Sequence, residues 1–411
     1  MALIVPFKAI RPTKEEAATI AALPYDVYSR KEAYEKVKEQ PGSFLAIDRP
    51  ETQFAEDVDM YSDAVYNKAA EMLNQWISDG RFIQDTDDFY YVYELTMDGR
   101  SQTGIVACAS IDDYQNSVIK KHENTRAEKE QDRIRHVDTC SAQTGPIFLA
   151  YKADSTISGV VSKTKSRQPQ YDFTAEDGIR HRCWVIDKMM DKALIATAFD
   201  KMNSIYIADG HHRAASAVKV GLMRREDNPG YTGKEDFNFF LSVLFPDEEL
   251  KIYDYNRVVK DLNGLAPEEL LEELDSIVDI VETSESPIRP AVKGQWSMLL
   301  EGTWYLCQVK PELMVDDPVE GLDVSLLQNL VLEPLLGIQD PKTDDRIDFV
   351  GGIRGLEELE RRCNSDCKIA FAMYPTSIQE LFDVADAGLL MPPKSTWFEP
   401  KLRSGLFIHK I

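Results

Sequence analysis

Hydrophobic and polar positions along the chain predict short strands interleaved with helices. Residues 61–79 have apolar side chains at helical spacing, namely Val65, Ala69, Met72, Leu73 and Trp76. Residues 89–95 and 102–110 predict two strands joined by the turn Asp98-Gly99, which is a hairpin signal. The strongly apolar run 237–245 predicts a further strand, and the short run 44–47 predicts another.

Residues 205–217 read Ile-Tyr-Ile-Ala-Asp-Gly-His-His-Arg-Ala-Ala-Ser-Ala and predict a strand, a tight turn and a helix. Residues 205–207 are β-branched or aromatic and suit a short buried strand, while Asp209-Gly210 is a turn signal. The alanines that follow favour a helix beginning near His211. Free backbone N–H groups and the helix dipole favour an anion at such a junction. The stretch is therefore a candidate phosphate site; the alternative is an ordinary turn with a hydrogen-bonded histidine pair.

Residues 121–136 carry almost no apolar side chains. One interpretation is a solvated helix with ion pairs at helical spacing, Arg126–Glu130 and Glu130–Arg133. The other is a functional loop and helix that brings a set of polar side chains to a pocket. That set comprises His122, Glu123, Arg126, Lys129, Asp132 and Arg133. A solvated face is the usual outcome for a charged helix, but the density of mixed charge directly after a strand keeps both interpretations open.

Two further segments offer polar groups. In Leu23-Pro-Tyr-Asp-Val27, Asp26 is either a cap for the next helix, a role that Ser29 could also fill, or a carboxylate that faces a pocket; the sequence favours the cap. Near the C-terminus, Lys394, Ser395, Thr396 and Lys401 offer two ammonium groups and two hydroxyls. These groups suit a phosphate or a carboxylate, and the alternative is a polar loop before a terminal strand.

The best candidate for a domain boundary is the turn Asn263-Gly-Leu-Ala-Pro267. We therefore predict an N-terminal region over residues 1–262 that carries the ligand site, and a C-terminal region over residues 263–411 whose terminal loop returns to it.

Composition narrows the possible partners. The 411 residues are 43% hydrophobic and 28% charged, as in ordinary globular proteins, and the net charge is −23. A surface this acidic repels nucleic acid and anionic membranes, so an anionic substrate would need a local cationic pocket or a divalent metal. The six cysteines are scattered without a CxxC pair, and neither a secretory signal nor a membrane-spanning run is present. These features predict a reduced, cytoplasmic protein that binds a small molecule.

Several motifs together carry a resemblance to the domain of unknown function 1015 family over nearly the whole chain. They are Val5-Pro-Phe, Leu23-Pro-Tyr-Asp-Val27, His122-Glu-x-Thr with Lys129 and Asp132-Arg133, Ala208-Asp-Gly-His-His-Arg213, Leu322-Asp-Val-Ser325, Glu333-Pro-Leu-Leu-Gly337 and Met391-Pro-Pro-Lys-Ser-Thr-x-Phe-x-Pro-Lys401. Within them, Asp209-Gly-His-His-Arg resembles the signature of the ParB/sulfiredoxin-like superfamily, in the branch that contains free L-serine kinases.

The resemblance implies an α+β fold with mixed sheets, a ParB/sulfiredoxin-like core and a smaller C-terminal α/β portion that completes the site. It also implies a nucleotide or pyrophosphate site at the turn. The phosphate-binding residues would be Asp209, Gly210, His211, His212, Arg213, Lys394, Ser395, Thr396 and Lys401. Asp209 would bind Mg²⁺ or orient a histidine. Where sulfiredoxins have a cysteine beside the His-Arg pair, this chain has a histidine, which argues against sulfinic-acid reduction. The acidic charge argues against a role in DNA partitioning.

The predicted reaction is phosphoryl transfer from ATP, ADP or pyrophosphate to a small hydroxylated metabolite, with free L-serine as the first candidate. The reverse reaction would dephosphorylate phosphoserine. Glu123 is the candidate general base, with His211 and His212 as further catalytic residues. Asp26, Thr125, Lys129 and Arg133 are candidates for substrate binding. Alternatives are a hydrolase of a phosphorylated metabolite and a nucleotide-binding regulator without chemistry. The sequence does not predict the oligomeric state. Segments 121–133 and 391–401 should converge on the turn.

Overall fold

The computed structural model describes all 411 residues, which divide into two compact units. Unit 1 comprises Met1–Leu250 and Pro400–Ile411, and unit 2 comprises Lys251–Glu399. This division lies upstream of the boundary that we predicted between residues 262 and 263. It also assigns the last twelve residues, 400–411, to unit 1.

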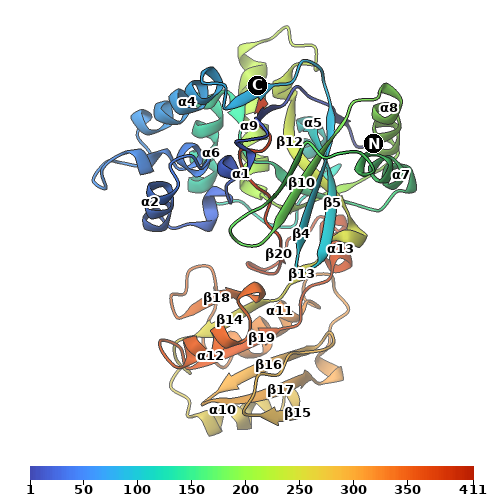
Figure 1. The fold of residues 1–411 in the computed structure, drawn as a ribbon. Helices are drawn as coiled ribbons and strands as arrows, with labels where there is room; N and C mark the ends of the chain where they lie inside the picture. Colours follow the sequence, from blue (N-terminus) through green and yellow to red (C-terminus); the bar gives the residue numbers. More distant parts are fainter. The chain divides into compact units, whose positions relative to one another are not determined.

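A nine-stranded mixed sheet forms the centre of unit 1, with strand order β6-β11-β8-β12-β5-β4-β10-β9 and β1 paired to β5 (Figure 1). The strands are β1 (Ile4–Val5), β4 (Tyr90–Met97), β5 (Arg100–Ser110), β6 (Ile119–Lys120), β8 (Ile147–Tyr151), β9 (Tyr171–Thr174), β10 (Arg180–Ile186), β11 (Ile205–Asp209) and β12 (Phe239–Pro246). The pairs β11–β6 and β12–β8 are parallel, and the remaining pairs are antiparallel. The predicted α+β class with mixed sheets is confirmed.

Two groups of helices complete unit 1. Beside the large sheet are α5 (Ile111–Gln115), α7 (Ser155–Lys165), α8 (Met189–Asp200) and α9 (His211–Asp227). The second group comprises α1 (Ala17–Ile20), α2 (Arg30–Glu39), α3 (Leu45–Asp48), α4 (Asp63–Ser78) and α6 (Ala127–Cys140). This second group has its own apolar core, in which Trp76 stacks on Phe82 with ring centroids 6.2 Å apart. Helix α6 packs against both α4 and α9, so it joins the two groups.

Short elements bring the ends of the chain into this second group. Strand β2 (Ile10–Pro12) pairs with β3 (Phe82–Gln84), and β21 (His409–Lys410) pairs with β7 (Ala142–Gln143). The 3-10 turns are η1 (Tyr25–Val27), η2 (Pro50–Gln53), η3 (Asp236–Asn238) and η4 (Asp247–Glu249). The C-terminal segment is therefore held in unit 1 by backbone hydrogen bonds.

Unit 2 is built on a six-stranded antiparallel sheet with order β15-β17-β16-β19-β14-β18. Its strands are β14 (Tyr255–Val259), β15 (Val278–Ser284), β16 (Gln295–Leu300), β17 (Thr303–Val309), β18 (Ile347–Gly351) and β19 (Ile369–Met373). A separate pair joins β13 (Ile252–Tyr253) to β20 (Trp397–Phe398). The helical elements are α10 (Pro267–Leu274), η5 (Pro311–Leu313), α11 (Asp323–Leu327), the π-helical turn η6 (Gln328–Leu332), η7 (Gly352–Arg354), α12 (Glu357–Cys363) and α13 (Ile378–Asp386).

Most predicted elements are present, with one correction. The Asp98-Gly99 hairpin is confirmed, because both residues have positive φ, 51° and 77°. The strand predicted over residues 44–47 is wrong. Phe44 is the N-cap residue of the short buried helix α3, which comprises Leu45–Asp48. A four-residue apolar run buried on all sides has no periodicity that distinguishes the two structures.

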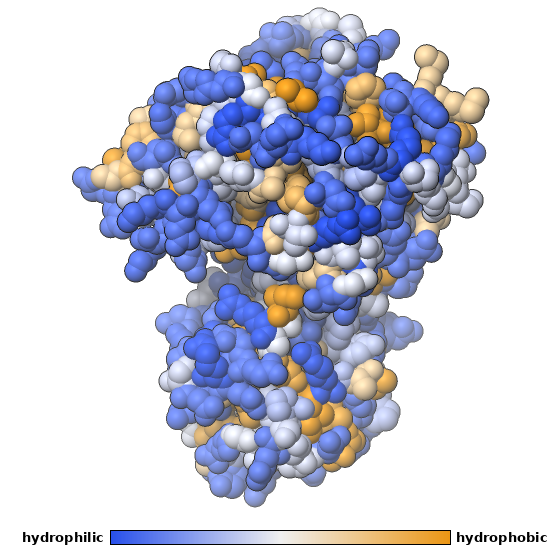
Figure 2. Space-filling view, viewed as in Figure 1, coloured by the Kyte–Doolittle hydropathy of each residue, from blue (hydrophilic) through white to orange (hydrophobic).

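The surface is mainly polar on the side that is shown. The face shown in Figure 2 is dominated by hydrophilic residues, with apolar ones scattered among them. None of the helices combines the length and the apolar character that a transmembrane segment requires.

Close packing of α9 gives a stability prediction. A Cβ at Gly221 would lie 2.4 Å from the Phe237 carbonyl oxygen and 2.8 Å from Ile111 Cδ1. We expect Gly221→Ala to lower the free energy of unfolding by about 1–3 kcal/mol, because backbone must move to admit the methyl group. The matched control is Gly159→Ala in α7, where a methyl group would meet no other atom within 4 Å and alanine should be neutral or stabilising. Urea unfolding of both variants measures this, and equal stabilities would contradict it.

Candidate functional site

The predicted strand, turn and helix at residues 205–217 are confirmed. Strand β11 ends at Asp209, Gly210 has φ 94°, and α9 begins at His211. This left-handed conformation favours glycine. A side chain at Gly210 would also lie 3.1 Å from the guanidinium of Arg213. The 17-residue helix α9 thus presents its free N–H groups directly after the turn.

Asp209 is the anionic centre of the turn. Its Oδ2 lies 3.1 Å from Lys401 Nζ and 4.0 Å from Arg213 Nη2. Burial acts to raise the pKa of this carboxyl, but the charges of Lys401 and then Arg213 outweigh it, so the pKa lies well below its usual range. Asp209 is therefore ionised at neutral pH. The prediction that Lys401 would reach the turn, across 192 positions of sequence, is confirmed.

Arg213 is anchored on one side only. Its Nη1 donates to the Pro146 carbonyl at 2.5 Å, whereas its buried Nε has no hydrogen-bond partner. Gly145 lies beside this side chain and leaves room for Ser404, since a Cβ there would lie 2.9 Å from Ser404 Oγ. The guanidinium thus retains donor capacity beside the turn.

A pair of buried histidines lies behind the turn. The rings of His122 and His211 meet edge to face, with centroids 4.5 Å apart and planes at 90°. Burial lowers the pKa of His122 to about 4. Burial, and then the neighbouring His122, lower the pKa of His211 far below its ordinary value. Both rings are therefore neutral at pH 7, and the buried Nε2 of His211 has no hydrogen-bond partner.

Two contacts tie the segment before α6 to the turn. The Arg126 backbone N–H donates to His212 Nε2 at 2.9 Å, which places the proton of a neutral His212 on Nδ1. Glu123 Oε2 lies 3.9 Å from His211 Nδ1, and the Glu123 side chain is 46% exposed. The predicted convergence of residues 121–133 on the turn is confirmed at these two positions.

The interpretation of α6 as a solvated helix is wrong. Glu130 and Arg133 are both only 7% exposed, and neither predicted ion pair along the helix forms. Glu130 accepts a hydrogen bond from Thr125 Oγ1 at 2.6 Å and pairs with Lys219, while Arg133 pairs with Asp132 at 2.8 Å. The Thr125 hydroxyl predicted to bind substrate thus donates to Glu130. Glu130 and Arg133 are buried because α6 packs between α4 and α9.

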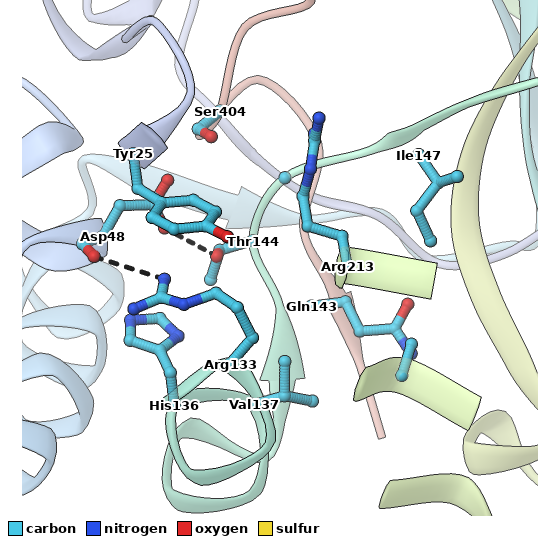
Figure 3. A pocket seen from close by; sticks show the side chains of 12 residues that line it. Tyr25, Asp48, Arg133, His136, Val137, Gln143, Thr144, Ile147, Arg213 and Ser404 are labelled. Carbon is cyan, nitrogen blue, oxygen red and sulfur yellow. Dashed lines mark hydrogen bonds between the residues drawn. The ribbon is translucent and has the colours of Figure 1, made fainter. Parts of the chain in front are cut away.

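Arg133 lines two pockets of unit 1. The first, which we name the Arg213 pocket, is lined by Tyr25, Asp48, Arg133, His136, Val137, Gln143, Thr144, Gly145, Ile147, Arg213, Ala217 and Ser404 (Figure 3). The Arg133 guanidinium lies 4.1 Å from the centroid of the Tyr25 ring, and Thr144 Oγ1 donates to Asp48 Oδ1 at 2.8 Å. The pocket thus has a cation at each side, Arg133 beside Asp48 and Arg213 away from it.

The second pocket is the Lys129 pocket. Its lining includes Asp26, Lys129 and Asp132, and it shares Tyr25 and Arg133 with the first pocket. Three of the four residues predicted to bind substrate therefore line one pocket. The cap favoured for Asp26 is wrong, because Ser29 caps α2 in a reciprocal arrangement with Glu32.

Lys394, Ser395 and Thr396 belong to unit 2. Lys394 is exposed with φ 60°, and its Nζ lies 5.4 Å from the centroid of the Tyr255 ring. Ser395 is buried, and its hydroxyl donates to the Pro392 carbonyl at 2.7 Å. That these residues take part in the site at the turn stays a prediction.

The donor set gives limited support for a metal. Among all described residues, no group of three His, Cys, Asp or Glu side chains is arranged to hold a metal ion. Mg²⁺ is commonly held by one or two carboxylates together with substrate phosphates. Asp209 fits that role only with a phosphate bound, since its carboxylate is paired with Lys401.

Sequence reasoning missed the Asp48 and Thr144 side of the Arg213 pocket. Asp48 lies in the turn α3, which we predicted as a strand, and Thr144 follows the two-residue strand β7. The signal that could have drawn attention to the pocket was Tyr25, within the motif Leu23-Pro-Tyr-Asp.

The buried histidines make stability depend on pH. Between pH 6.5 and about 4 the unfolded chain binds a proton at residue 122 that folded His122 does not, so stability is lost as pH falls through this window. We expect His122→Asn to reduce the slope of unfolding free energy against pH by up to about 1.4 kcal/mol per pH unit there. Urea unfolding of wild type and variant from pH 7 to pH 4 measures the slopes. Identical slopes would show that His122 titrates normally in the folded protein.

Comparisons with known proteins place the chain in a family. A mutant of free serine kinase in complex with ADP has 13% identity and a TM-score of 0.34, covering 73% of this chain and 92% of that one. SbnI with a C-terminal truncation, from Staphylococcus aureus, has 11% identity and a TM-score of 0.39, covering 72% and 85%. No curated protein matches the sequence. The family model described as protein of unknown function (DUF1015) matches residues 4–325, so the chain belongs to the DUF1015 family.

Proposed function

We propose that this protein is a phosphotransferase that acts on a small hydroxylated metabolite, with free L-serine as the first candidate. The observation that carries the proposal is the turn at the start of α9, where backbone N–H groups, Arg213 and Lys401 surround Asp209. Catalysis of phosphoryl transfer consists mostly of positioning and charge neutralisation. A rigid turn that combines fixed N–H donors with two cations supplies both.

The phosphate groups of the donor would bind at the turn. The N–H groups of Gly210, His211 and His212 precede the first hydrogen-bonded turn of α9, and the helix dipole favours an anion there. The Nε of Arg213 and the Nε2 of neutral His211 are further buried groups available for hydrogen bonding. Lys401 would exchange part of its contact with Asp209 for a phosphate oxygen. Mg²⁺ held between Asp209 and the donor would neutralise charge developed in transfer.

Glu123 is the proposed general base. Its carboxylate is half exposed and lies 3.9 Å from the ring of His211, so it is at the edge of the turn and within reach of solvent. The acceptor hydroxyl would give its proton to Glu123 as its oxygen forms a bond to the phosphorus atom. The bond between that phosphorus and the donor's bridging oxygen breaks, and the shortened nucleotide or phosphate leaves. Asp209, whose pKa is depressed, remains ionised throughout.

The Lys129 pocket is the proposed site of the acceptor. An amino acid carries a carboxylate and an ammonium group, and this pocket offers Lys129 and Arg133 for the first and Asp26 for the second. These charges of both signs support a zwitterionic acceptor over a neutral alcohol or sugar.

A binding and product screen tests the proposed function. L-Serine is combined with ATP, ADP or pyrophosphate in the presence of Mg²⁺, and melting temperature and phosphoserine are measured. We expect one donor to raise the melting temperature and to yield phosphoserine. Release of phosphate without a need for serine would instead indicate a hydrolase. Stabilisation without phosphoserine in any combination would contradict the kinase proposal and leave the phosphate site.

Substitution of the base gives a separate prediction. We expect Glu123→Gln to lower kcat by about 10²- to 10⁴-fold, as for loss of a general base, with little change in donor affinity. The matched control is Glu128→Gln, an exposed glutamate in the first turn of α6, which should keep wild-type turnover. Steady-state kinetics of both variants with the donor found in the screen measures the difference. Full turnover by Glu123→Gln would contradict the assignment of Glu123 as the general base.

A further inference from the structure

Unit 2 contains a buried arginine without an acidic partner. Arg257 lies in β14, a strand flanked by β18 and β19, and is 3% exposed. Its cross-strand neighbours are Phe349 and Phe371, and its guanidinium lies 5.4 Å from the centroid of the Phe349 ring. The surroundings of this charge are thus largely aromatic.

The hydrogen bonds of Arg257 go to backbone carbonyls. Nη1 donates to Tyr255 and Nη2 donates to Lys394 at 3.1 Å, which uses two of the five N–H donors of a guanidinium. No ion pair of Arg257 exists among the described residues, and the acid closest to it in sequence, Asp254, instead accepts from Asn256 and faces Arg289 at 3.7 Å. Burial lowers the pKa of Arg257 to about 10, and no carboxylate offsets this effect.

An uncompensated buried charge destabilises a folded protein, so its presence calls for a physical reason. The usual structural reason, a buried ion pair, is absent here. A neutral donor could satisfy the two carbonyl groups equally well, so these hydrogen bonds do not explain the charge. A charge that is held ready for an anionic ligand is the remaining explanation with a defined chemistry.

Lys394 is a second cation that contacts the same residues, Arg257 and Tyr255. Its backbone carbonyl accepts from Arg257, and its Nζ lies near the Tyr255 ring, whose residue supplies the other carbonyl acceptor of Arg257. Lys394 has φ 60°, a conformation that residues other than glycine rarely adopt. Arg257 and the loop around Lys394 are therefore fixed to each other, and no acidic side chain pairs with either cation among the described contacts.

We propose that Arg257 and Lys394 form an oxyanion site in unit 2 that binds a phosphoryl group of a small-molecule ligand. The planar guanidinium supplies directed N–H donors and the lysine supplies a mobile point charge, a combination suited to phosphate. From the sequence, a phosphate-binding role was predicted for Lys394 and none for Arg257. The inference assigns this role to Arg257 as well. It rests on the geometry of unit 2 and holds whether or not the protein transfers phosphate.

Hydrogen–deuterium exchange with inorganic pyrophosphate tests this site in the full-length protein. We expect millimolar pyrophosphate to slow exchange in peptides covering residues 391–399, and acetate at equal ionic strength to have no such effect. Equal protection by acetate would show a site for carboxylates or for anions in general and overturn the phosphoryl assignment. Unchanged exchange in 391–399 with pyrophosphate would overturn the site itself.

Variants identify the residues that bind. Lys394→Gln should lose most of the protection at 391–399 and fold normally, because Lys394 is exposed. Arg257→Met should lose it as well, and Arg257→Lys should retain part, since the charge remains without the fork. The matched control is Lys342→Gln, an exposed lysine elsewhere in unit 2 that should behave as wild type. Full protection in Lys394→Gln would contradict the proposal even if Arg257→Met fails to fold.

The same measurement separates this site from the proposed function. Peptides covering residues 205–213 report the turn of unit 1, and those covering 391–399 report unit 2. Protection at 391–399 without phosphoserine formation would support the oxyanion site and contradict only the kinase proposal. If Lys394→Gln forms phosphoserine as the wild type does, and pyrophosphate gives no protection at 391–399, the kinase proposal is supported and the oxyanion site is contradicted.

Discussion

The ion pair between Asp209 and Lys401 determines the properties of the turn in unit 1. The two groups lie 3.1 Å apart, and Lys401 makes the largest charge contribution that keeps the pKa of Asp209 low against burial. Lys401 is placed by the C-terminal segment, in which Ser404 N donates to Ala22 O at 2.8 Å and Ile408 N to Ile10 O at 2.8 Å. Backbone hydrogen bonds therefore fix the lysine, and the lysine fixes the charge of the aspartate.

This arrangement explains how a protein with a net charge of −23 could attract an anion. Around the turn, Arg213 and Lys401 balance the two carboxylates of Asp209 and Glu123, and His122 and His211 are neutral because they are buried. The local charge is thus close to zero rather than strongly negative, and the dipole and free N–H groups of α9 favour an anion there. Neutral rings leave hydrogen-bonding nitrogens at the site without adding charge that would hold a product phosphate too tightly.

Local features were predictable from the sequence, and distant partners were predictable only in part. The strand, turn and helix at 205–217 follow from nearest-neighbour chemistry, in which Gly210 permits a positive φ and the alanines favour a helix. The burial of Glu130 and Arg133 did not follow, because a charged helix shows its buried face only when the neighbouring helices are placed. The same limit applies to α3, whose four residues are buried on every side. Lys401 was predicted because its ammonium group suits a phosphate, and no repeating sequence pattern placed it near Asp209. Their contact depends on pairing of the C-terminal segment with β2 and β7.

The cations at the turn of unit 1 and the buried Arg257 of unit 2 differ in how their charge is compensated, and this difference bears on function. Lys401 and Arg213 face a carboxylate, so the turn of unit 1 is stable before any ligand binds, and a phosphate must compete with Asp209. Arg257 faces carbonyls and aromatic rings, so its charge is destabilising until an anion arrives. A compensated site favours exchange of ligands, whereas an uncompensated buried cation gains more from each anion it binds. Because an arginine inside a short strand has no sequence signature of burial, only the structure reveals that β14 carries a charge without an acidic partner.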